Sequence, residues 1–160
     1  MRFNIFKKEK DSIYAPVNGE ILPLSEVPDP VFSQKMMGEG IAMIPEAGKV
    51  FSPVKGSVIL IAETKHAIGI REVDGTEILI HVGLETVSLN GEGFTIAVNV
   101  GDKVSTGQLL MEFDLDTIKK RAKSIITPIV ITNSNENGKQ YRFTQEKKGI
   151  KGETVIIYET

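Results

Sequence analysis

Short apolar runs, separated by Gly, Pro, Asn and Asp, repeat along the chain from Ile13 onward. Runs of this length, bounded by turn-forming residues, are typical of β-strands. Many short strands at close spacing indicate a sandwich or barrel. One helical turn is predicted at 116–122, where Asp114 or Asp116 can cap the N-terminus. The predicted strands are 13–15, 19–24, 40–44, 49–51, 56–62, 66–72, 76–82, 94–98, 108–113, 129–132, 141–144 and 154–158.

Two segments of the chain resemble each other. The segment Ala15-Pro16-Val17-Asn18-Gly19-Glu20-Ile21-Leu22 recurs as Ser52-Pro53-Val54-Lys55-Gly56-Ser57-Val58-Ile59. In each, a proline fixes φ at the entry and a glycine supplies the freedom that a turn needs. We therefore expect an all-β fold with few short helical turns, in which two similar β units pack face to face.

The start of the chain differs from the rest. Residues 1–12 mix basic and apolar side chains without a helix cap, so we expect a flexible leader ahead of a single domain at 13–160. The alternative is a weak contact with a membrane surface through residues 1–10, in which Phe3, Ile5 and Phe6 lie beside basic residues. The total length of 160 residues fits one domain.

Composition narrows the classes of function. Charged residues make up 25% and apolar residues 41% of the chain, which excludes an ordinary disordered protein. The formal net charge of −2 lacks the basic excess of a nucleic-acid-binding protein, so no nucleic acid is expected as a partner. Cysteine is absent, which excludes disulfides and Cys-type zinc sites. No apolar run approaches the ~20 residues of a membrane span, so we expect a cytoplasmic protein.

The chain has only two histidines, His66 and His81, and they flank a predicted hairpin. The Asp74-Gly75 pair between them is typical of a two-residue type I′ turn. With that turn, Ile68 faces His81, and both histidines share one face of the sheet with backbones roughly 7–8 Å apart. A one-residue slip of either strand would separate them. The alternative is that they are two unrelated polar residues.

Two close histidines without cysteine leave few kinds of chemistry. The chain has neither the Gly-x-Ser-x-Gly elbow of serine hydrolases nor a P-loop. A catalytic zinc site usually needs three protein ligands, and only nearby glutamates could add a third. The remaining option is phosphoryl transfer, in which one neutral imidazole accepts the group and the second imidazole and a hydroxyl bind its oxygens. Thr64 can supply that hydroxyl, and Gly83 leaves room for a phosphoryl group or a partner's backbone.

Five segments of the chain resemble the glucose-type IIA component of the bacterial sugar phosphotransferase system. They occur in the family's order at 15–21, 27–40, 64–69, 80–94 and 127–133. The most specific is the segment that begins Ile80-His81-Val82-Gly83-Leu84-Glu85-Thr86. The resemblance implies an antiparallel β-sandwich with internal pseudo-symmetry, which agrees with the repeat.

The resemblance also implies roles for single residues. His81 carries the phosphoryl group on Nε2, His66 stays unphosphorylated, and Thr64 orients His66. The implied donor is phosphorylated HPr, and the implied acceptor is a cysteine of a sugar-specific IIB domain. No cofactor is required, although zinc could bind His66 and His81 with a further ligand from a partner. The implied partner surface is an apolar depression with Gly83 and Glu85 beside it, formed by Val31, Phe32, Met36, Met37, Ile68, Leu79 and Val87.

Two other functions remain open at this point. A regulatory binding protein could keep the fold without the transfer. A biotinyl or lipoyl carrier domain has similar Pro-Val-x-Gly turns, and Lys35-Met36 is the only candidate for its attachment site. We expect a phosphocarrier that supports sugar uptake, with regulation as a further role.

Overall fold

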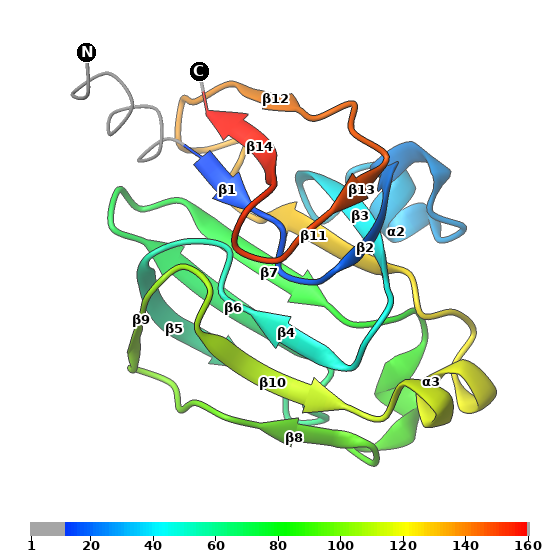
Figure 1. The fold of residues 1–160 in the computed structure, drawn as a ribbon. Helices are drawn as coiled ribbons and strands as arrows, with labels where there is room; N and C mark the ends of the chain where they lie inside the picture. Colours follow the sequence, from blue (N-terminus) through cyan, green and yellow to red (C-terminus); the bar gives the residue numbers. More distant parts are fainter. Residues whose placement is uncertain (1–11, 160) are drawn as a thin grey trace.

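A computed structural model describes residues 12–159, which form mainly antiparallel strands (Figure 1). The hypotheses of a flexible leader and of membrane contact fall outside the described residues, except that Ser12 opens the first strand. The strands are β1 (Ser12–Tyr14), β2 (Gly19–Pro23), β3 (Glu39–Pro45), β4 (Lys49–Phe51), β5 (Gly56–Ile61), β6 (Ala67–Glu72), β7 (Glu77–His81), β8 (Phe94–Ile96), β9 (Lys103–Val104), β10 (Leu109–Phe113), β11 (Thr127–Ile131), β12 (Tyr141–Phe143), β13 (Lys148–Gly149) and β14 (Val155–Glu159). The helices are η1 (Leu24–Glu26), α2 (Pro30–Ser33), η2 (Thr86–Leu89) and α3 (Leu115–Arg121).

The strands form one large sheet and two small ones. The large sheet has the order β13-β2-β3-β11-β7-β6-β5-β9, and the small sheets are β1-β14-β12 and β4-β10-β8. Apolar side chains from all three sheets meet in the main core. The expected all-β antiparallel fold is confirmed, and every predicted strand overlaps an observed one. Among residues 12–159, no helix is both long and apolar enough to cross a bilayer.

Both faces of the central strands are apolar. Alternate residues of a strand point to opposite faces, and on β6 and β7 the set that includes Ile68 and Ile80 lies in the main core. The other set, which includes Ala67 and Leu79, lies in a smaller cluster on the outer face. His81 follows Leu79 by two residues and therefore lies on this outer face as well.

The segment that contains η1 and α2 covers the outer face. It contributes Leu24, Val27 and Phe32 to the smaller cluster. Asp29 caps α2 by accepting a hydrogen bond from the Val31 N–H, at 3.0 Å. Burial of an aromatic side chain such as Phe32 contributes roughly 1.5–3 kcal/mol, so the helix is held mainly by this contact. The cap and the contact together fix the segment beside His81.

The two repeated segments bind each other through equivalent positions. The Tyr14 N–H donates to the Pro53 carbonyl at 3.0 Å, and the Phe51 N–H donates to the Pro16 carbonyl at 2.8 Å. Each segment thus offers an equivalent acceptor, and the residue just before each segment offers an equivalent donor. Pseudo-symmetry of the whole fold stays a prediction.

The glycine in each repeated segment is required for the same reason. A Cβ at Gly19 would lie 1.9 Å from the Ile44 carbonyl oxygen, and one at Gly56 would lie 2.2 Å from that of Arg71. Both glycines open a strand whose neighbour approaches too closely for any side chain. Replacing either one would force the paired strands apart.

The helix prediction is confirmed, with Asp114 rather than Asp116 as the cap. The Asp114 carboxylate accepts from the Thr117 N–H at 3.2 Å. The short elements β9, β13, η1, α2 and η2 have no counterpart in the prediction. Elements of two to four residues are too short to show a periodic pattern.

The predicted register of the β6–β7 hairpin is wrong by one residue. Ala67, not Ile68, pairs with His81, and Ile68 pairs with Ile80. The loop has three residues, because the Glu72 N–H donates to the Thr76 carbonyl. The next section shows where this slip leaves the two histidines.

Candidate functional site

The two histidine rings lie against each other despite the slip in register. Their centroids are 4.7 Å apart and the ring planes are at 78°. His81 is the last residue of β7, and His66 immediately precedes β6. His66 lies in the loop before the strand, where regular alternation no longer determines the side-chain direction. The predicted meeting of the two histidines is confirmed, but the register from which we derived it is not.

The tautomer of His81 follows from its hydrogen bond. Its Nδ1 lies 2.8 Å from the Gly83 carbonyl oxygen. A carbonyl oxygen only accepts, so Nδ1 carries the proton and the neutral ring has its lone pair on Nε2. Gly83 has φ 75°, and a Cβ there would lie 2.6 Å from Thr86 Cγ2. A glycine is therefore needed to turn this carbonyl toward the ring.

The ring of His66 is held by Thr64. The Thr64 hydroxyl lies 2.7 Å from His66 Nδ1. If the hydroxyl donates, the proton of a neutral His66 lies on Nε2. Thr64 therefore makes the contact with His66 that the resemblance implied. A contact of its hydroxyl with a phosphoryl group stays a prediction.

Both imidazoles are kept neutral near pH 7. Burial lowers the pKa of His66 to about 4; the charge of His81 adds to this effect and the backbone of Thr64 opposes it. Burial also lowers the pKa of His81, while the backbone carbonyl of Gly83 and the charge of Asp29 act in the opposite direction. A neutral imidazole has the free lone pair that a nucleophile needs.

The surface beside His81 is apolar with two acids at its edge. A cavity of about 250 Å³ is bounded by His81, Asp29, Glu85 and neighbouring apolar side chains. Asp29 did not emerge from our sequence reasoning, although it lies in one of the resembling segments. Four of the apolar residues predicted for a partner surface are exposed: Val31, Met36, Met37 and Val87.

The other predicted surface residues lie deeper. The Phe32 ring contacts His81, with centroids 5.0 Å apart, but it is 4% exposed. Leu79 is also buried beneath the surface. Ile68 is fully buried on the opposite face, in the main core, so the structure does not bring it to the site. The register slip explains this error, because it moves Ile68 from the face of His81 to the other face.

The two histidines do not complete a metal site by themselves. Within residues 12–159, the only grouping of three metal-ligating side chains is Glu72, Asp74 and Glu159. His66 and His81 offer two imidazole nitrogens, so a tetrahedral zinc ion there would need ligands from outside the described chain.

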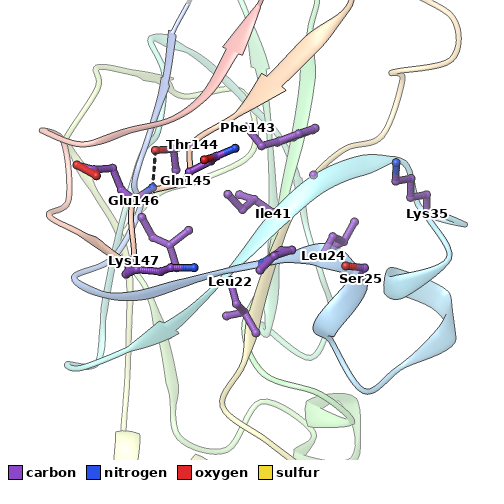
Figure 2. Close-up of a pocket in the computed structure, with 13 residues that line it drawn as sticks. Leu22, Leu24, Ser25, Lys35, Ile41, Phe143, Thr144, Gln145, Glu146 and Lys147 are labelled. Atoms are coloured by element: carbon purple, nitrogen blue, oxygen red, sulfur yellow. Dashed lines mark hydrogen bonds between the residues drawn. The ribbon is translucent and has the colours of Figure 1, made fainter.

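A larger cavity, of about 520 Å³, lies away from the histidines (Figure 2). The segment 143–147 borders one side of it, and β2 and η1 border the other. Leu22, Leu24, Ile41 and Phe143 contribute apolar surface. The cavity contains no histidine, so cavity size does not locate the chemistry of this protein.

Comparison with known proteins identifies close relatives. The family described as phosphoenolpyruvate-dependent sugar phosphotransferase system, EIIA 1, matches residues 11–137. The chain is 50% identical over 159 residues to the PTS system glucose-specific EIIA component of Oceanobacillus iheyensis, covering 96% of each protein. It is 52% identical over 145 residues to the glucose-specific EIICBA component of Staphylococcus carnosus, covering 91% of this chain and 21% of that protein. The solved structure of glucose permease IIA from Mycoplasma capricolum superposes with a TM-score of 0.85 at 38% identity, covering 91% of this chain and 94% of that one.

Proposed function

Because the chain belongs to the EIIA 1 family of the phosphoenolpyruvate-dependent sugar phosphotransferase system, we propose that it is a phosphocarrier with His81 as the phosphoryl acceptor. The donor is phosphorylated HPr, and the acceptor is a cysteine of a sugar-specific IIB domain. The relative named EIICBA, in which the matching region is one part of a longer protein, supports a IIB partner. The observation that carries the proposal is the bond between His81 Nδ1 and the Gly83 carbonyl, which leaves Nε2 free to attack.

The chemistry follows from that tautomer. The Nε2 lone pair attacks phosphorus, and the Nε2–P bond forms as the P–N bond to the donor breaks. The electron pair of the broken bond stays on the donor nitrogen. The phosphorylated His81 ring keeps its proton on Nδ1, bonded to the Gly83 carbonyl, and is cationic. A cationic ring is a good leaving group, so the same hydrogen bond prepares the onward transfer to a thiolate.

His66 has the geometry of an assisting group. With the Thr64 hydroxyl donating to Nδ1, the Nε2–H of His66 can donate to a phosphoryl oxygen on the adjacent ring. This would stabilise the negative charge that develops on the oxygens during transfer. His66 does not become phosphorylated, because no acceptor carbonyl fixes its proton on Nδ1 as Gly83 does for His81.

The exposed apolar residues form the proposed partner surface. Val31, Met37 and Val87 line the cavity beside His81 together with Asp29 and Glu85, and Met36 is exposed next to Met37 in the sequence. An apolar centre with acids at its rim suits partners with a basic rim of their own. Methionines repack easily, which suits a surface that must bind both HPr and a IIB domain.

Three finer points belong to the same proposal. The protein acts in the cytoplasm and requires no cofactor. Zinc binds His66 and His81 only when a partner adds ligands. Regulation through partner binding would use the same surface. The match to the EIIA 1 family removes the carrier-domain alternative and the role of Lys35 as an attachment site.

The test is phosphorylation followed by mass spectrometry. Incubation with phosphoenolpyruvate, enzyme I and HPr should add one acid-labile phosphoryl group to the parent protein, and His81→Ala should not gain it. The matched control is His66→Gln, which should still gain the group. Persistence of the added mass in His81→Ala would refute the assignment.

A further inference from the structure

Four residues other than glycine have left-handed backbone within residues 12–159. They are Lys35, Lys65, Glu85 and Asn90, with φ between 53° and 63°. Lys65 directly precedes His66, Glu85 and Asn90 flank η2 after His81, and Lys35 follows the helix that carries Phe32. Such a conformation is unfavourable for a residue with a Cβ, and such strain often occurs at functional sites.

Lys65 occupies a defined position in the loop that joins β5 to β6. The Ala62 N–H donates to the Ala67 carbonyl at 2.9 Å and closes the loop, and the Lys65 N–H donates to the Ala62 carbonyl at 2.8 Å. Lys65 then turns the chain with φ 63°. Glycine and asparagine are the usual residues for a left-handed position in a hairpin loop. A lysine there is the unfavourable choice.

The stem of Lys65 lies beside the other loop of the site. A Cβ at Gly91 would lie 3.5 Å from Lys65 Cδ and 3.8 Å from Lys65 Cγ. Gly91 itself follows Asn90 and has φ 87°. A Cβ at these distances would be in ordinary van der Waals contact, so the exposed lysine stem lies beside Gly91 and brings the loop before His66 next to the loop after His81.

The turn at Lys65 bears directly on Thr64 and His66. In an extended strand, residues two apart are separated by roughly 6.6 Å, and a left-handed residue between them brings them closer. The Thr64 hydroxyl and His66 Nδ1 are 2.7 Å apart. The observed register pairs Ala67 with His81, so a strand continued regularly through His66 would place that ring on the opposite face.

We propose that Lys65 is a positioning residue for the transfer step: its left-handed turn, with the stem beside Gly91, keeps Thr64 on His66 and His66 against His81. This inference rests on the proposed function. It assigns Lys65 no contact with the phosphoryl group. It predicts that what matters at this position is first the backbone conformation and second the stem.

The test compares three substitutions in the full chain. Lys65→Asn tolerates the left-handed turn and should transfer to a IIB domain within about twofold of the parent. Lys65→Val, which disfavours that turn because of its branched Cβ, should slow transfer to IIB by roughly 10-fold, below the usual contribution of acid–base assistance. Acceptance from HPr should change by less than about twofold in both. Lys65→Ala keeps the backbone penalty of the parent and loses the stem, so its rate of transfer to IIB should lie between those of the Asn and Val variants. It replaces Lys65→Val in the comparison if that variant does not fold.

A second readout is independent of any phosphoryl transfer. The ¹⁵N chemical shifts of the His66 ring report its tautomer in the unphosphorylated protein. We expect one tautomer in the parent and in Lys65→Asn, and a mixture in Lys65→Val and Lys65→Ala. Parental shifts and parental transfer in the folded Val or Ala variant would overturn the inference. Equal transfer defects in Lys65→Asn and Lys65→Val would also overturn the inference, because the left-handed backbone conformation would then not be the cause of the defect. Failure of the proposed function would instead show as missing phosphorylation of the parent.

Discussion

The β6–β7 hairpin carries desolvated titratable groups at both of its ends. At the open end, burial lowers the pKa of His66 to about 4 and also lowers that of His81. At the turn, burial first, and then the charge of Glu159, raise the pKa of Glu72 to about 9. Burial therefore favours the neutral form of the two histidines at the open end and of Glu72 at the turn.

The two ends differ in what surrounds these groups. Lys139 closes the turn end: its ammonium bonds Asp74, and it donates to Glu159 at 2.8 Å and to the Thr76 hydroxyl at 3.2 Å. The histidine end faces exposed apolar side chains, and the lone pair of His81 Nε2 points to no described partner. A shifted pKa alone therefore does not distinguish the two ends, and the proposed site rests on the free lone pair of His81 beside an open surface.

The largest effect is expected on phosphoryl transfer, which should respond to a substitution at the histidine end of the hairpin and not to one at the turn. His66→Gln should still accept a phosphoryl group from HPr. Transfer to IIB should slow by ~10²-fold, because the imidazole Nε2–H that we place on a phosphoryl oxygen is lost. Rapid-quench measurement of each half-reaction checks this. Glu72→Gln serves as the control at the other end and should transfer at the parental rate. Equal slowing of both half-reactions in His66→Gln would show that the two histidines do not have distinct roles.

The next largest effect is expected on stability, which should respond to a substitution at the turn end of the hairpin. Lys139→Met should lower the free energy of unfolding by about 3 kcal/mol, because it leaves the Glu159 carboxylate, 5% exposed, without its cation; the value is at the low end for a buried pair because Lys139 is 27% exposed. Denaturant unfolding at pH 7 measures this. The control is Lys148→Met, whose exposed pair with Glu46 should contribute less than about 1 kcal/mol. Phosphorylation of His81 should remain normal in both variants, and a similar stability loss in the two would contradict the comparison.

The pH dependence of stability should show both ends with opposite signs. The pKa of Glu72 is raised from 4.5 to about 9, so its contribution is complete below pH 4.5 and is lost as the pH rises toward 9. The pKa of His66 is lowered from 6.5 to about 4, so its contribution is complete above pH 6.5 and is lost as the pH falls toward 4. Glu72→Gln should flatten the alkaline side only. Denaturant midpoints between pH 5 and 9 test this, and an unchanged alkaline slope would count against the account of Glu72.

The smallest effect concerns the rim of the histidine end. Glu85→Lys should slow HPr association severalfold, and the defect should shrink with added salt, because Glu85 is exposed and its charge acts at a distance. Val87→Glu places a charge in the apolar centre and should weaken binding with little recovery in salt. Stopped-flow association at two ionic strengths distinguishes them. A collapsed melting temperature in Val87→Glu would show that Val87 supports the fold.

The strands could be predicted from the sequence because alternation and turn residues act locally. The register of the hairpin could not. Gly75 has φ 98°, but Asp74 is not left-handed, and its carboxylate accepts from the Thr76 N–H. The turn therefore needs one left-handed residue where the predicted type I′ turn needs two, and the loop gains a residue.

The cluster at the turn, formed by Glu72, Asp74, Lys139 and Glu159, could not be predicted from the sequence for another reason. Glu72 lies in β6, Asp74 in the turn, Lys139 in a later loop and Glu159 in β14. No local sequence pattern links these positions. Their meeting depends on β14 reaching the hairpin tip, which only the packed fold determines. The turn at Lys65 is similar, because lysine gives no local signal of a left-handed backbone.

The pairing of β1 with β14 has a consequence for how the protein is made. Ile13 pairs with Ile157, so the first described strand finds its partner only when the last one has been synthesised. At about 5–20 residues per second, a ribosome takes roughly 7 to 30 s to cover that interval. During this time the apolar side of β1 has no β14 to bind. The fold can therefore be completed only after β14 has been synthesised.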